Sequence, residues 1–175
     1  TGTVLPESPT FFKVGAAPVD GAVKVTHKYP ALSLAKTKSV DDLKSFLGER
    51  KGYLSWKLDG LTLVATYIDG KLKSLVTRGN GLVGEDITRN APYICGVALD
   101  IPYKEEVVIR GEALCSYPAF EKINARIENE GDKYKNPRGV ASGSVRLLDV
   151  KELEEREIHF IPFELVSPKA NSVKE

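Results

Sequence analysis

One stretch of the chain constrains its fold more than any other, because its side chains follow the pattern of two strands on either side of a two-residue turn. Residues 61–67 alternate between an apolar set and a set that contains two threonines, and a second apolar run begins at Leu72. Between them lies Asp69-Gly70, a dipeptide that favours a tight hairpin turn because both central residues accept positive φ. The sequence therefore predicts two antiparallel strands joined at this turn.

Further helices and strands surround the hairpin. The predicted elements are helices over 40–50 and 117–130 and strands over 106–114 and 159–166. The first helix follows the capping residue Ser39 and ends near Gly52, and the second ends at Gly131. Because strands outnumber helices and occur partly as hairpins, we predict an α+β fold with a mainly antiparallel sheet.

Composition excludes several classes of protein. With 175 residues, of which 42% are hydrophobic and 28% charged, the chain is long enough and apolar enough for one folded domain. It has no apolar run near the roughly 20 residues of a membrane span and no secretory segment, so we expect no membrane partner and a cytoplasmic location. Two cysteines and two histidines are too few for a zinc finger. We expect Cys95 and Cys115 to be buried thiols.

Proline content divides the chain into two parts. Residues 1–38 carry four of the ten prolines and show no sustained periodicity, which indicates an N-terminal strap entering the domain. Residues 39–175 form the predicted core. Since the chain starts at Thr1 and contains no Met, we expect it to be a fragment of a larger protein.

The segment Lys57-Leu58-Asp59-Gly60 contains a candidate nucleophile. A lysine amine attacks only when neutral, and apolar neighbours such as Trp56 favour the neutral form by removing water. The simpler alternative is an exposed lysine at the end of a strand, and the motif alone does not decide between them.

Two further motifs add groups suited to a nucleotide. Arg78, within Thr-Arg-Gly-Asn-Gly, has the fork of donors that binds a phosphate, and the glycines allow the backbone a close approach. Glu112 ends a predicted strand and would accept a hydrogen bond from a ribose hydroxyl. The alternatives are a solvated arginine in a glycine-rich turn and a surface charge pair.

Two arginines lie eight residues apart in a segment of small residues, 136–146. If this segment is helical, Arg138 and Arg146 lie on roughly one face and would contact a phosphate backbone. The alternative is a small-residue helix packed in the core with the arginines at its rim.

In their order and spacing these motifs resemble the adenylation (nucleotidyltransferase) domain of bacterial NAD-dependent DNA ligases. The resemblance runs from about Glu7 to Val166 and includes Pro30-Ala31-Leu32-Ser33-Leu34 and the aromatic strand Phe160-Ile161-Pro162-Phe163. It implies an incomplete nucleotidyltransferase fold that lacks the later motifs of the family.

The resemblance also implies an activity and a role for each motif. The family adenylylates itself on a lysine, here Lys57, with NAD as the adenylate donor and Mg2+ present, passes AMP to the 5′-phosphate of a nick in double-stranded DNA, and seals the nick in replication and repair. The implied nucleotide-binding residues are Ser33, Leu34, Asp59, Arg78 and Glu112, the implied DNA- or phosphate-contacting residues are Arg138 and Arg146, and no residue is assigned to a metal. We expect the fragment alone to be inactive or weak.

The chain departs from the family's pattern at several positions. The glutamate that reads adenine is replaced by Ser55, and Ala35 and Asn80 replace two further polar residues of the motifs. Two alternatives therefore stay open: an ATP-dependent polynucleotide ligase or capping-type nucleotidyltransferase, and a ligase-like binding module without catalysis. The entry segment and the arginine-containing motif favour the NAD-dependent group.

Overall fold

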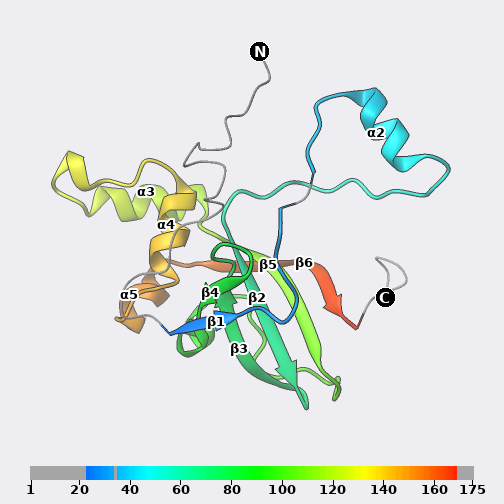
Figure 1. The fold of residues 1–175 in the computed structure, drawn as a ribbon. Coiled ribbons are helices and arrows are strands. Elements are labelled where there is room, and N and C mark those ends of the chain that lie inside the picture. The colour runs from blue at the N-terminus through cyan, green and yellow to red at the C-terminus, as the bar shows by residue number, and fades with distance from the viewer. Residues whose placement is uncertain (1–22, 34, 169–175) are drawn as a thin grey trace, which may run out of the picture.

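The structure is a computed structural model that describes residues 23–33 and 35–168. The strands are β1 (Lys24–Thr26), β2 (Leu61–Ile68), β3 (Lys71–Thr77), β4 (Val83–Glu85), β5 (Val107–Leu114) and β6 (His159–Ser167). The helices are α2 (Val40–Leu47), α3 (Tyr117–Ala125), α4 (Pro137–Ser144) and α5 (Val150–Glu155), with short 3-10 helices at Thr88–Tyr93 and Glu130–Asp132. The larger sheet is antiparallel in the order β3-β2-β5-β6, and β1 pairs with β4 (Figure 1).

The predicted hairpin is confirmed. Strands β2 and β3 pair antiparallel, with Ile68 opposite Lys71. Asp69 and Gly70 form the turn with φ of 51° and 76°, the left-handed conformation that this dipeptide tolerates. The predicted strands over 106–114 and 159–166 are also present, so the mixed fold with an antiparallel sheet is confirmed.

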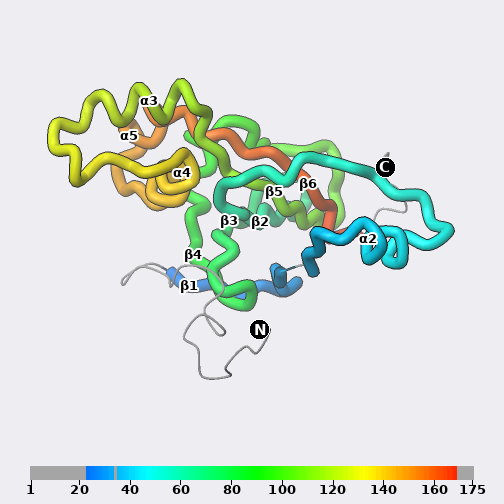
Figure 2. The backbone as a smooth tube through the Cα atoms, turned by 90° about the horizontal axis from the view of Figure 1, so that it is seen from above, coloured from blue at the N-terminus to red at the C-terminus, as the bar shows by residue number. Residues whose placement is uncertain are grey.

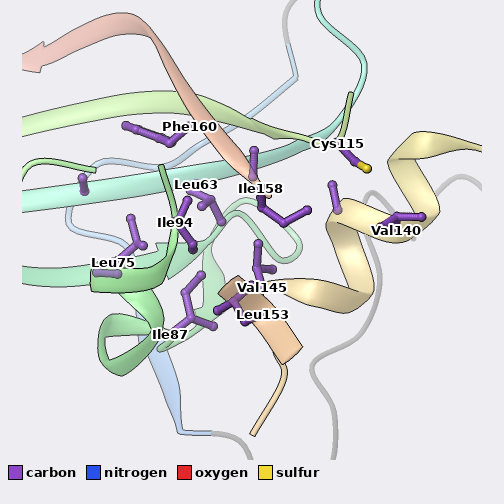
Figure 3. Close-up of a cluster of buried hydrophobic side chains, with 14 of the residues drawn as sticks. Leu63, Leu75, Ile87, Ile94, Cys115, Val140, Val145, Leu153, Ile158 and Phe160 are labelled. Carbon is purple, nitrogen blue, oxygen red and sulfur yellow. The ribbon is translucent and has the colours of Figure 1, made fainter. Parts of the chain in front are cut away.

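One face of the larger sheet carries the main core. Side chains from β2 and β5 on this face meet residues of α4, α5 and the 3-10 helix at Thr88–Tyr93 (Figure 3). Leu63, Val140, Val145, Leu153 and Ile158 have no exposed surface. Burial of these apolar side chains stabilises the body of the molecule, residues 61–168.

The opposite face of the sheet is covered by an N-terminal stretch, residues 27–33, which we call the crossing segment. Its Ala31 is buried against Val64 and Val108, which point to this face because side chains alternate along a strand. Just before this segment, β1 adds the small second sheet, which the sequence did not predict.

Helix α3 is shorter than predicted. It ends at Ala125, and Gly131 lies within a separate 3-10 turn. The side chain of Asn124 explains the early end, because it donates to the carbonyl of Tyr134 and accepts from the N–H of the same residue. These two bonds turn the chain back toward α4.

Helix α2 begins as predicted but lies off the body. The Ser39 hydroxyl accepts from the N–H of Asp42, as a capping residue does. The helix ends at Leu47 with Gly48 in a positive-φ conformation, four residues earlier than Gly52. Figures 1 and 2 both show α2 at the end of a long loop, apart from α3, α4 and α5. No side chain within residues 35–59 is buried, and we call this stretch the arm.

The two cysteines differ from each other. Cys115 is buried as expected, whereas the expectation for Cys95 is wrong because its side chain is exposed. Burial raises the pKa of the Cys115 thiol. None of the described helices is long and apolar enough to cross a membrane.

Candidate functional site

The candidate site lies at one end of the sheet, on the face that the crossing segment covers. Thr62 of β2 stands opposite Glu112 of β5, so both side chains point to this face. Arg78, the first residue after β3, donates its backbone N–H to the carbonyl of Thr62 at 2.9 Å. The sheet register therefore brings to one end of the sheet an arginine and a glutamate that lie 34 positions apart in the sequence.

Glu112 is buried, with 8% of its surface exposed, and both its carboxylate oxygens are bound. Oε1 accepts from the backbone N–H of Gly60 at 3.0 Å, and Oε2 accepts from the hydroxyl of Thr62 at 2.9 Å. An ionised carboxylate has about four acceptor positions, so each oxygen retains capacity for another donor such as a ribose hydroxyl.

Gly60 fixes the point where the arm meets the body. A Cβ at this position would overlap the carbonyl oxygen of Ala113, so only glycine allows β2 to start so close to β5. With the bond to Glu112, this contact anchors the chain three residues after Lys57.

Arg78 contacts the crossing segment. Its Nε donates to the carbonyl of Ala31 at 2.8 Å, and Nη2 donates to the hydroxyl of Ser33 at 2.9 Å. The structure therefore brings together two of the residues that the sequence assigned to the nucleotide. Leu34, assigned with them, lies outside the described residues.

The turn after Arg78 is held by Asn80. Its side-chain oxygen accepts from the backbone N–H groups of Leu82 and Val83 at 3.0 and 2.8 Å. Asparagine thus closes this turn in the manner of an Asx-turn. The neighbouring Gly79 has a φ of 55°, a conformation that favours glycine.

Asp59 and Arg138 border a pocket beside this site. Their side chains form an exposed ion pair at 2.7 Å, which joins the last residue of the arm to the first turn of α4. The pocket has a volume of about 440 Å3 and is lined by Asp59, Leu114, Cys115, Ser116, Tyr117, Asn136, Pro137, Arg138, His159 and Ile161. The raised pKa of Cys115 keeps this thiol protonated at neutral pH, so it is a poor nucleophile.

Arg146 is placed differently from Arg138. It forms an ion pair with Glu85, a residue of β4 with only 1% of its surface exposed, and also donates to the carbonyl of Ser142. Between the two arginines, Val140 and Ala141 are buried. The segment is therefore a small-residue helix packed in the core, and its arginines contact different partners at its two ends.

Lys57 lies in the arm and is exposed. The structure records no hydrogen bond or ion pair from it to any residue of 23–33 or 35–168. The expectation that its neighbours enclose it is wrong for this conformation, since Trp56 beside it is 92% exposed. The anchor at Gly60 nevertheless keeps the Lys57 backbone within roughly 11 Å of the Glu112 contact, the length of three extended residues.

A family comparison identifies the domain. A sequence model of the NAD-dependent DNA ligase adenylation domain matches residues 21–175, which is most of the chain. This chain belongs to the NAD-dependent DNA ligase adenylation domain family.

Curated proteins named DNA ligase match the adenylation domain along nearly its whole length. The protein from Ruminiclostridium cellulolyticum is 49% identical over 174 residues, covering 99% of this chain and 26% of the relative. The protein from Lachnoclostridium phytofermentans is 49% identical over 95% of this chain and 25% of the relative. That from Halothermothrix orenii is 36% identical over 95% of this chain and 26% of the relative. The chain thus spans about a quarter of the length of the curated relatives it matches.

The adenylation domain offers no ready-made metal centre in its described part. Across residues 23–33 and 35–168, no three histidine, cysteine, aspartate or glutamate side chains gather as a metal would require. The carboxylates of the site are engaged instead, Asp59 with Arg138 and Glu112 with Gly60 and Thr62. These residues do not fit a protein-built Mg2+ site.

Sequence reasoning missed several residues that shape the site of the adenylation domain. Thr62 orients Glu112, Glu85 holds Arg146, and Arg110 binds the crossing segment. The alternation in 61–67 contained the signal for Thr62, since it placed the threonines on one face. Nothing in the sequence marked Glu85 or Arg110 as a partner, because those contacts depend on sheet pairing between distant segments.

Proposed function

We propose that Lys57 is the residue that becomes adenylylated, with NAD as the adenylate donor. The observation that supports this assignment is that Gly60, three residues after Lys57, donates to the carboxylate of Glu112, while Arg78 binds the backbone of Thr62, two residues further along. The lysine is tethered next to donors and acceptors suited to a phosphate and a ribose. Membership in the adenylation domain family supports the same chemistry.

In the proposed step the neutral Nζ of Lys57 attacks the phosphorus of the AMP half of NAD. A nitrogen–phosphorus bond forms while the phosphorus–oxygen bond of the pyrophosphate breaks, and nicotinamide mononucleotide leaves with the bonding pair. The amine gives up a proton to water. Because an amine attacks only when uncharged, we propose that the bound nucleotide and the apolar side chains of the arm together exclude water from Lys57.

The residues of the site take complementary roles in this proposal. Glu112 accepts from the ribose hydroxyls, and Arg78 neutralises charge on the phosphate from the position in which it binds Ser33. Leu34 is proposed to contact the nucleotide with Ser33. Mg2+ is proposed to accompany the phosphates of NAD, since it commonly binds through substrate phosphates, and no step is assigned to it.

The activity of the whole protein is also a proposal. We infer that AMP passes from Lys57 to the 5′-phosphate of a nick in double-stranded DNA, in the cytoplasm where DNA and NAD are available. The exposed Arg138 at the rim of the pocket supports a phosphate contact there. Arg146 is proposed to support that surface from its ion pair with Glu85. We further propose that residues 39–175 are part of a nucleotidyltransferase fold, which residues 1–38 enter.

Mass spectrometry of the full-length protein tests the donor and the nucleophile together. We expect an AMP adduct after incubation with NAD and none after incubation with ATP. Lys57→Arg keeps the charge but removes the reactive amine, so it should carry no adduct with either donor. An adduct formed from ATP, or an adduct on Lys57→Arg, would contradict the proposal.

A further inference from the structure

We propose that Arg110 is a positioning residue of the nucleotide site, acting through the crossing segment rather than by touching the nucleotide. The inference rests on the proposed function, because it assigns Ser33 and Arg78 to nucleotide binding. It concerns how the sheet holds these two residues in place.

Arg110 lies in the middle of β5, opposite Val64 of β2 and Glu164 of β6. Its side chain is only 16% exposed and points to the face that the crossing segment covers. Nη2 donates to the carbonyls of Pro30 at 2.9 Å and Tyr29 at 3.4 Å, and Nη1 pairs with Glu164 at 2.8 Å. A single guanidinium thus connects two strands of the sheet with the segment above them.

The crossing segment needs these donors because it is not part of either sheet. Its residues 27–33 lie outside the strands, so the carbonyls of Tyr29, Pro30 and Ala31 have no partners from a strand ladder. All three instead accept from guanidinium groups, the first two from Arg110 and the third from Arg78. Hydrogen bonds from a charged donor are stronger than those between neutral groups.

The two arginines divide the segment between them. Arg110 binds the carbonyls of Tyr29 and Pro30 in the first half, where Glu106 also accepts from Lys28 and Tyr29. Arg78 binds Ala31 and Ser33 in the second half. Because Arg78 uses two of its donors on this segment, the position of the segment also sets the orientation of its guanidinium. Loss of Arg110 would therefore displace Ser33 and misalign Arg78, which weakens binding of NAD more than the reaction of bound NAD.

The test is the dependence of Lys57 adenylylation on NAD concentration in the full-length protein carrying Arg110→Gln. We expect the NAD concentration for half-maximal rate to rise about tenfold, the loss typical of one charge-assisted hydrogen bond. The rate at saturating NAD should stay within about twofold of the unsubstituted protein. Arg110→Lys retains one charged donor, so its half-maximal NAD concentration should lie between those of Arg110→Gln and the unsubstituted protein.

Glu164→Gln is the matched control. It removes the ion pair of Arg110 but leaves the donors to Pro30 and Tyr29, so its half-maximal concentration should stay within about twofold. An equal effect of Glu164→Gln and Arg110→Gln would overturn the inference, as would a fall in the saturated rate of Arg110→Gln without a rise in the half-maximal concentration.

Hydrogen exchange separates this inference from the proposed function, because it requires no reaction. We expect Arg110→Gln, and not Glu164→Gln, to speed amide exchange in the peptide covering 27–33, where the Ala31 N–H is bound to the carbonyl of Gly81. Unchanged exchange in Arg110→Gln would overturn the inference. Absence of any adduct on Lys57 in the unsubstituted protein would instead overturn the proposed function.

Discussion

The body of the molecule and the arm differ in where they place their apolar side chains. In the body, leucines such as Leu63 and Leu153 have no exposed surface. In the arm, Leu54 is fully exposed, and Phe46 and Trp56 are mostly exposed. The two regions have similar side chains but different surroundings, so the body is stabilised by burial and the arm is not.

The body is therefore the source of stability, while the arm carries the proposed nucleophile. The arm carries Lys57, whereas Arg78 and Glu112, which are proposed to bind the nucleotide, are anchored on the body. Segments that move during binding come from the less stable parts of a protein. We infer that the arm gains its apolar contacts when the nucleotide is bound, which brings Lys57 and the body together.

The same substitution in the two regions tests this comparison with the largest expected effect. Leu153→Ala removes a fully buried side chain and should lower the free energy of unfolding by about 4 kcal/mol. Leu54→Ala, in the arm, should change it by less than about 0.5 kcal/mol. Urea denaturation of both variants measures the difference, and equal losses would show that the arm is packed like the body.

Two arginines give a second contrast, within the body, with a smaller expected effect. Arg138 lies in the first turn of α4, and Arg146 follows its C-terminal end. Arg146→Ala leaves the buried carboxylate of Glu85 without this counter-ion and should cost about 3 kcal/mol. Arg138→Ala removes an exposed ion pair with Asp59 and should cost less than about 1 kcal/mol. Thermal or urea unfolding compares them. A larger loss of unfolding free energy in Arg138→Ala than in Arg146→Ala would contradict the importance of the buried pair between Arg146 and Glu85.

The strands of the larger sheet could be predicted from sequence more fully than the ends of the helices. The hairpin at Asp69-Gly70 and the strand over 107–114 follow from local turn chemistry and alternation, which act over a few residues. Helix α3 ended early because Asn124 binds Tyr134, a contact formed between residues ten positions apart that no local pattern reveals.

For the site, the sequence motifs identified the residue types but not their surroundings. The meeting of Arg78, Ser33 and Glu112 at one end of the sheet agrees with their assignment to one site, whose role stays a prediction. The exposure of Lys57 agrees with the alternative that the motif left open, because burial depends on tertiary packing that the local residues do not determine. The contrast between Arg138 and Arg146 also required the fold, since it depends on which distant carboxylate pairs with each arginine.

Trp56 offers the test of the arm with the smallest expected effect. It is the only tryptophan among these 175 residues, so its fluorescence reports on the arm. Its exposure predicts fluorescence typical of an indole in water and ready quenching by acrylamide. Addition of NAD to the full-length protein should shift to shorter wavelength the part of the emission that a Trp56→Phe variant lacks, and reduce its quenching, because the arm then packs against the body. An unchanged spectrum at saturating NAD would contradict this closure.

The proposed chemistry depends most directly on which residue carries AMP. After reaction of the full-length protein with NAD, peptide mapping by mass spectrometry should locate the adduct on Lys57 and on no other lysine of the chain. The neighbouring Lys51 and the strand residue Lys71 serve as internal controls, since both are exposed, and Lys71 differs from Lys57 in its ion pair with Asp100. An adduct on either of these lysines, with Lys57 unmodified, would contradict the central claim.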